Sequence, residues 1–149
     1  MNRDPALISL SRDHHKTLVA AQELRRATAQ TAADVRARFL SYWNTHGRAH
    51  FRTEEEVLLP AFAAHGDPYH RLVGRALCDH VAIRQRVDAL VSESPALPAV
   101  LHDLGSRLAE HVRLEERELF PLIERTMPAA RLAAVAVALE QAAAGKPGE

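Results

Sequence analysis

A short motif that pairs a histidine with a glutamate occurs twice in this chain. Residues 50–60 read His-Phe-Arg-Thr-Glu-Glu-Glu-Val-Leu-Leu-Pro, and residues 111–121 read His-Val-Arg-Leu-Glu-Glu-Arg-Glu-Leu-Phe-Pro. The shared pattern places a glutamate four residues after each histidine, as in His50 with Glu54 and His111 with Glu115. Residues four apart lie on one face of an α-helix, about one turn from each other. Each copy can therefore aim an imidazole and a carboxylate at one point.

Two further histidines lie at corresponding places in the two halves of the chain. Asp13-His14 precedes the first copy of the motif, and Asp79-His80 precedes the second. His14 and His80 each fall within a stripe of apolar residues at three- and four-residue spacing, which indicates the inner face of a helix. His15 is the alternative to His14, but its neighbours one turn away are polar, so we prefer His14 as the inward residue.

Metal binding explains why such groups would lie in a helical core. A single His-Glu pair on a helix is usually a surface pair worth a few tenths of a kcal/mol, about 0.2–0.5, but two inward copies with two more inward histidines need another reason. A buried carboxylate is costly unless it is paired or bound to metal. The predicted metal ligands are His14, His50, Glu54, His80, His111 and Glu115.

The number of ligands predicts two metals rather than one. Six protein ligands exceed the four of a tetrahedral zinc site, and imidazole with carboxylate suits iron, copper, nickel or zinc. If Glu54 and Glu115 both bridge, and an oxo or hydroxo group bridges as well, two histidines bring each metal to five ligands. One open position then remains on each metal for water, O2, peroxide or NO.

The elements that must position these residues are all helices. Apolar residues recur with helical spacing in four long segments, at about 4–28, 32–63, 68–92 and 97–125, and in a shorter one at 131–143, whereas no segment shows sustained strand alternation. Short links at His65–Pro68 and Ser94–Pro98 separate them. We therefore expect an all-α, up-down-up-down antiparallel four-helix bundle with an additional C-terminal helix.

One domain accounts for the whole chain. Residues 1–127 are expected to form the bundle, 128–144 the additional helix of the same domain, and 145–149 a disordered tail. The additional helix is a candidate surface for a homodimer or another protein partner.

Composition excludes several classes of partner. Lys+Arg and Asp+Glu balance at 19 each, so no net charge draws the chain to nucleic acid or to a membrane surface. The sequence has no apolar run of 18 residues and no signal peptide, and its single cysteine, Cys78, cannot form an internal disulfide. These features predict a cytoplasmic protein. Nine histidines in 149 residues agree with metal chemistry.

The order H…H-x-x-x-E…H…H-x-x-x-E over residues 7–125 resembles the hemerythrin-like, or HHE cation-binding, family. The resemblance implies a non-haem centre with two irons, bridged by an oxo or hydroxo group. It implies that His14 and His50 bind one iron, that His80 and His111 bind the other, and that two glutamates bridge. The expected ligands are small: O2, peroxide or NO.

The chain departs from the oxygen-carrying hemerythrins at two positions. Those proteins have an Asp five residues after the fourth-helix histidine, whereas here the acidic ligand is expected to be Glu115, four residues after His111, although Glu116 lies at the fifth position. They also have a second histidine one turn after the third-helix ligand, where this chain has Arg84. This difference favours reaction with, or sensing of, O2, peroxide or NO over reversible O2 carriage. The alternatives are a peroxide-decomposing or NO-reducing enzyme, a non-catalytic iron- or oxygen-sensing module, and a mononuclear or zinc site.

Some residues near the predicted ligands keep two interpretations. His46, one turn before His50, is either a further ligand or a core histidine. Arg84 either pairs with a carboxylate near the site, where it could stabilise a bound anion, or reaches solvent. Glu55 and Glu116 are either acceptors for histidine N–H groups or surface charges, and we favour the surface slightly.

Overall fold

The computed structural model describes residues 2–92 and 96–145, and helices account for nearly all of them. The predicted turn at Ser94-Pro95 and the predicted disordered tail beyond Gly145 fall outside those residues. The helical elements are η1 (Pro5–Leu7), α1 (Ile8–Arg25), α2 (Ala32–Tyr42), η2 (Trp43–Gly47), α3 (Arg48–Thr53), η3 (Glu54–Leu58), α4 (Leu59–Ala63), α5 (Arg71–Ala89), α6 (Leu97–Leu114), η4 (Glu115–Leu119), α7 (Phe120–Thr126) and α8 (Ala129–Ala144).

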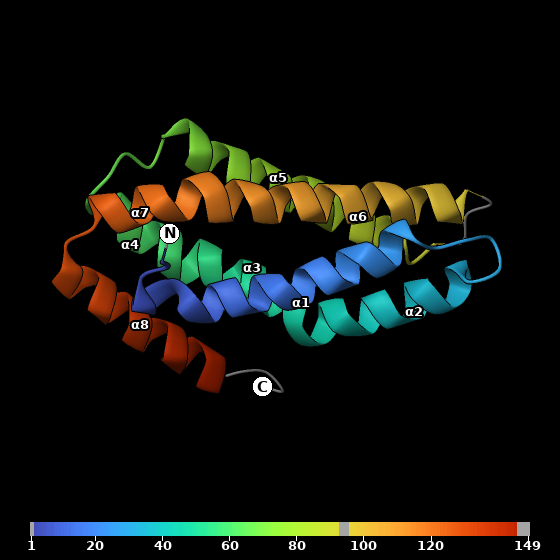
Figure 1. Cartoon of the computed structure of the whole chain (residues 1–149), viewed down its shortest axis with the longest axis horizontal. Coiled ribbons are helices and arrows are strands. Elements are labelled where there is room, and N and C mark those ends of the chain that lie inside the picture. The colour runs from blue at the N-terminus through green and yellow to red at the C-terminus, as the bar shows by residue number, and fades with distance from the viewer. Residues whose placement is uncertain (1, 93–95, 146–149) are drawn as a thin grey trace.

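These elements build the predicted antiparallel bundle. The run from α2 to α4 forms one continuous second helix, and the run from α6 to α7 forms the fourth, so that α1, α2–α4, α5 and α6–α7 alternate in direction (Figure 1). The fifth helix, α8, folds back along the bundle and packs against η1 and η3. No strand occurs in the described part of the chain, which confirms the all-α prediction. Among the same residues, no helix combines the length and apolar character that a membrane span requires.

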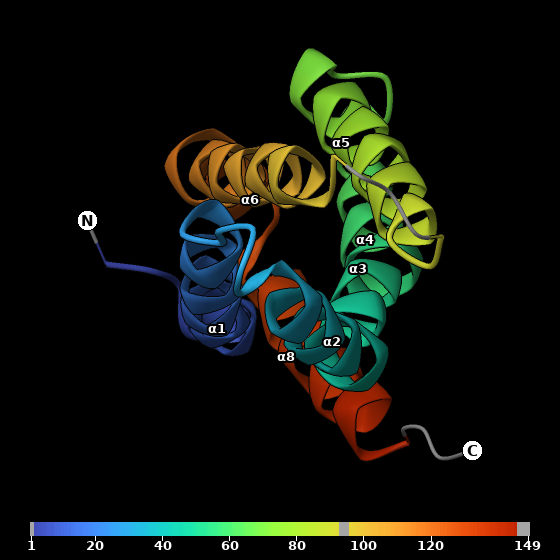
Figure 2. The same cartoon turned by 90° about the vertical axis from the view of Figure 1, so that its right-hand side faces the viewer.

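Figure 2 shows the four bundle helices end on, arranged around a shared interior. Two apolar clusters fill that interior. One contains Leu7, Leu58, Phe120 and the inner face of α8, and the other contains Leu24, Trp43, Ile83 and Leu104 among others. Four buried histidines and two buried glutamates occur outside both clusters, on the same helices that carry them. The core therefore combines two apolar regions with one buried polar group of side chains.

The glutamate of each sequence motif begins a π-helical turn. The widened turn η3 starts at Glu54, where the N–H of Leu59 donates to the Glu54 carbonyl, and η4 starts at Glu115 in the same way. Pro60 and Pro121 are each the second residue after these turns. Proline lacks an N–H and its ring clashes with the carbonyl four residues earlier in an α-helix, whereas a wider turn moves that carbonyl away. The proline of the motif thus explains the π turn.

A third π turn, η2, corrects the prediction for His46. The N–H of Arg48 donates to the carbonyl of Trp43, so one extra residue enters this turn. Gly47 then lies under the indole of Trp43, and a Cβ there would come within 2.6 Å of the ring. The extra residue rotates His46 to the exposed surface, and the predicted inner position of His46 is wrong.

Two leucines that continue the apolar spacing of their helices are nevertheless exposed. Leu18 on α1 and Leu77 on α5 are 40% and 39% exposed, and Thr17 takes the inner position beside Leu18. The third long helix, α5, begins at Arg71 rather than near Pro68, because His70 caps it: its Nδ1 accepts from the N–H of Leu72. Periodicity alone does not resolve such one-residue differences at the edge of an apolar stripe.

Helices α1 and α6 pack closely at a glycine, and this contact yields a prediction with a matched control. A Cβ on Gly105 would lie 2.7 Å from the backbone oxygen of Ala21, whereas a Cβ on Gly74 of α5 would meet nothing within 4 Å. We expect Gly105→Ala to lower the free energy of unfolding by about 1–3 kcal/mol because the helices must separate. Gly74→Ala should raise it by up to about 1 kcal/mol. Urea denaturation of both variants measures the two changes, and equal effects would contradict the close packing.

Candidate metal centre

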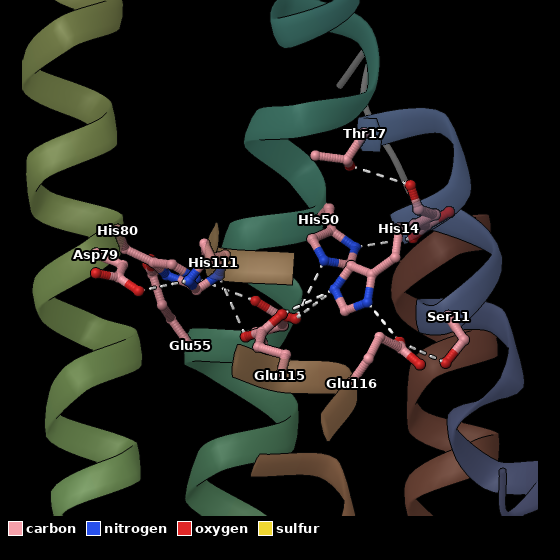
Figure 3. A network of polar contacts seen from close by, with 12 residues as sticks. Ser11, His14, Thr17, His50, Glu55, Asp79, His80, His111, Glu115 and Glu116 are labelled. Carbon is pink, nitrogen blue, oxygen red and sulfur yellow. Dashed lines mark hydrogen bonds and ion pairs between the residues drawn. The ribbon is translucent and has the colours of Figure 1, made fainter. Parts of the chain in front are cut away.

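Six buried side chains from four helices converge between the apolar clusters (Figure 3). His14 comes from α1, His50 from α3, His80 from α5 and His111 from α6, while Glu54 and Glu115 stand at the first residues of η3 and η4. Each of the six is at most 7% exposed. These are the six residues that the sequence predicted as metal ligands, and the fold brings all of them together. His15 is exposed and lines a surface pocket instead.

The two glutamates are shared between two pairs of histidines. Glu54 directs Oε2 to the Nε2 of His50 at 3.1 Å and Oε1 to the Nε2 of His80 at 3.1 Å. Glu115 directs Oε1 to the Nε2 of His14 at 2.8 Å and Oε2 to the Nε2 of His111 at 3.3 Å. Each carboxylate therefore spans both histidine pairs, one oxygen to each.

This sharing produces two overlapping clusters. In each one, potential ligand atoms lie within 4.8 Å of one another. One cluster contains His14 and His50, the other contains His80 and His111, and Glu54 and Glu115 belong to both. Two buried His/Glu clusters with common carboxylates are consistent with a binuclear metal site.

Several central atoms lack hydrogen bonds, which tests whether a metal fits. His50 Nε2, His111 Nε2 and Glu54 Oε2 are buried without a hydrogen-bond partner, although His50 Nε2 lies only 3.1 Å from Glu54 Oε2. Buried polar atoms are normally hydrogen-bonded, because an unpaired one costs roughly 1–3 kcal/mol. Lone pairs that face a common point are the arrangement that a cation satisfies, so the donor set fits a pair of metal ions.

Four further carboxylates surround the centre, and each contacts the outer nitrogen, Nδ1, of one of the four central histidines. The Nδ1 atoms of the four central histidines contact Glu116 (2.6 Å), Asp13 (3.0 Å), Glu55 (2.6 Å) and Asp79 (3.1 Å), in the order His14, His50, His80 and His111. A carboxylate that accepts the Nδ1 proton fixes the tautomer with a free lone pair on Nε2. These four outer carboxylates therefore aim all four Nε2 atoms at the centre.

The outer carboxylates follow the internal repeat of the sequence. Asp13 and Asp79 contact the histidine of their own half, whereas Glu55 and Glu116 each reach the histidine of the other half. The sequence left Glu55 and Glu116 open, with a slight preference for the surface, and this preference is wrong because both contact a buried imidazole. The signal was present: Asp-His and Glu-Glu pairs occur at the same places in both halves.

Arg84 lies beside the second half of the site. Its Nη2 contacts both oxygens of Glu55, at 3.2 and 3.0 Å, and its side chain is 30% exposed. The structure therefore supports the first of the two interpretations of Arg84, in which it pairs with a carboxylate near the site instead of reaching solvent. That carboxylate is Glu55 rather than one of the shared glutamates.

The surrounding carboxylates dominate the ionisation of the centre in the protein without metal. Burial lowers the pKa of His14, but hydrogen bonds to the surrounding carboxylates outweigh it and raise that pKa to about 11. The same opposing causes raise the pKa of His50 to about 9 and that of His111 to about 10. Burial alone would raise the pKa of Glu54, yet the charge and hydrogen bonds of the neighbouring histidines hold it well below its usual value. Protons on the imidazoles compensate the carboxylates when no cation does.

Comparison with known proteins agrees with this geometry. The family model described as "Hemerythrin HHE cation binding domain" matches residues 6–123. No curated protein and no solved structure gives a significant match. The matched residues contain all six central side chains and stop before α8. The chain therefore belongs to the hemerythrin HHE cation-binding domain family.

Proposed function

We propose that the protein binds two iron ions between its four central histidines and reacts with, or senses, O2, peroxide or NO. The observation that carries this proposal is the sharing of Glu54 and Glu115, because each offers one oxygen to each histidine pair. A mononuclear zinc site needs four ligands and no shared carboxylate. The proposed ligands are His14 and His50 for one ion, His80 and His111 for the other, and both glutamates for the two together.

Charge supports two cations at this place. Glu54, Glu115 and the four outer carboxylates surround the imidazoles, and Arg3, Arg75 and Arg84 pair with three of the outer ones. Arginine thus offsets three of the six negative charges, and the three that remain favour the binding of cations at the centre. Imidazole and carboxylate together are a common donor set for iron, which supplies redox chemistry toward O2, peroxide and NO when bound.

The protein side chains would hold the irons and orient the imidazoles that bind them, rather than react themselves. The outer carboxylates fix each imidazole through Nδ1, so the Nε2 atoms stay aimed at the centre. Two apolar clusters pack the same helices and so hold the backbone that carries these residues. Phe51 and Phe120 stack on the rings of His80 and His14 and shield one face of each.

A sensing role is the second candidate, because α8 contacts an element of the site. This helix packs against η3, the π turn that begins at Glu54, and against η1 at the start of α1. A conformational change at Glu54 would therefore be passed to α8, which lies outside the four-helix bundle. In this form of the proposal, α8 is the surface for a homodimer or a protein partner.

Metal analysis with a visible spectrum of anaerobically purified protein tests the main proposal. We expect two irons per chain, one for each cluster, and absorption typical of bridged ferric pairs after exposure to air. Zinc at one ion per chain without colour would contradict the proposal. Turnover of added peroxide or NO by the iron-loaded protein would favour a reactive role, and an iron-dependent change in oligomeric state without turnover would favour the sensing role.

The shared carboxylates give a sharper test of the binuclear arrangement. Glu54→Ala should abolish binding of both irons, because Glu54 offers an oxygen to each cluster. Glu56→Ala is the matched control, since Glu56 lies in the same π turn but is exposed and pairs with Arg52. Its iron content should equal that of the wild type. Loss of a single iron from Glu54→Ala, measured by metal analysis, would rule out a bridging role.

The pH dependence of stability should differ between the metal-free and iron-loaded protein. The pKa values of His14, His50 and His111 are raised to about 11, 9 and 10 without metal. Their stabilisation is therefore complete below the ordinary value near 6.5 and is lost as pH rises through 9 to 11. Urea denaturation of the metal-free protein should show a falling free energy of unfolding from pH 6.5 to 10. The loaded protein, whose imidazoles bind metal without that proton, should show a smaller fall; an equal fall would contradict the proposal.

A further inference from the structure

The two halves of the centre contain the same four-part contact, although the arginine and the phenylalanine in it do not correspond in the repeat. Arg84 pairs with Glu55, Glu55 accepts from His80, and Phe51 stacks on that histidine with ring centroids 3.8 Å apart. The Arg84 guanidinium also lies over the Phe51 ring, 5.7 Å from its centroid. One arginine thus contacts both groups that hold the His80 ring.

The other half reaches the same arrangement from different parts of the chain. Arg3, which precedes η1, pairs with Glu116, and Glu116 accepts from the Nδ1 of His14. Phe120 stacks on His14 with centroids 5.2 Å apart, and Arg3 lies 5.3 Å from the centre of the Phe120 ring. Arg84 lies four residues after His80, and the residue four after His14 is the exposed Leu18. The internal repeat therefore accounts for the histidine and the glutamate of each contact, but not for the arginine or the phenylalanine.

From these contacts we propose that Arg3 and Arg84 are positioning residues, each for one half of the centre: Arg3 for the His14–His50 half and Arg84 for the His80–His111 half. This inference rests on the proposed binuclear function. Each guanidinium holds a half-buried glutamate against the Nδ1 of one histidine, and this contact selects the tautomer whose Nε2 can bind a metal. Without the arginine, the glutamate can turn to solvent, and the imidazole loses the acceptor that fixes its Nδ1–H and the orientation of its ring.

The two arginines should differ in importance. Glu116 also accepts from the hydroxyl of Ser11 at 2.8 Å, so when Arg3 is removed it keeps a second partner besides His14. Among the described contacts, Glu55 is held by Arg84 and His80. We therefore expect Arg84→Met to weaken its half of the centre more than Arg3→Met weakens the other.

The first measurement uses the metal-free protein, so it does not depend on iron. Nuclear magnetic resonance of histidine side chains labelled with nitrogen-15 reports the hydrogen-bonded Nδ1–H of each central histidine. Arg84→Met should shift or broaden the His80 signal and leave the His14 signal in place, and Arg3→Met should do the reverse. Arg84→Lys should restore the His80 signal in part, because it keeps the charge without the two-oxygen contact or the planar stacking.

The second measurement is anaerobic titration with Fe²⁺ in competition with a coloured chelator. Arg84→Met should weaken one of the two Fe²⁺ equilibria on the order of tenfold, which is the low end for loss of a group that orients a metal ligand. Arg86→Met is the matched control, because Arg86 lies on the same helix but pairs with Asp103 away from the centre. It should change neither the resonances nor the affinities.

The outcomes separate this inference from the proposed function. If Arg84→Met leaves the His80 resonance as it is in Arg86→Met, or disturbs both halves equally, the inference is overturned whatever the iron content. If the resonances change as expected but neither the wild type nor the variants bind Fe²⁺, the proposed function fails while the positioning role stands.

Discussion

Burying ionisable groups inside a helical bundle is the constraint on which the rest of this structure depends. Two carboxylates and four imidazoles lie within the core, each at most 7% exposed. An isolated charge in such a place would cost many kcal/mol, so it must be paired, protonated or bound to a cation. The outer carboxylates, the arginines behind them and the stacked phenylalanines all serve to make that burial tolerable.

The widened turns show how the backbone adapts to the same constraint. Each shared glutamate occupies the first residue of a π turn, and a proline follows the turn in both halves. Single π turns inside α-helices are rare and occur often at functional sites. Here the added residue also moves the apolar face after the glutamate, so that Leu58, Leu59 and Phe62 become the buried residues.

Much of the fold and the centre could be predicted from the sequence because two signals agreed. Helical spacing defined the long segments. The pattern of His14, His50 and Glu54 recurs in the second half, and this repeat identified six residues that the fold does bring together. Register within a helix was harder. His46 was placed inward because an unbroken α-helix would place it there, and a single extra residue in η2 turns it outward. Contacts between distant segments, such as Arg3 with Glu116, leave no local pattern at all.

The exchange of Glu55 and Glu116 between the halves has a consequence for how the protein is made. The first half of the chain contains His14 and His50 with Glu54. However, the partner of the His14 Nδ1 is Glu116, and one carboxylate of the cluster belongs to Glu115, so both come from the second half. Until the ribosome has synthesised the fourth helix, neither ion position has its full set of side chains. On the proposed ligand set, metal uptake follows completion of the bundle, and a nascent first half would not retain iron in half of a site.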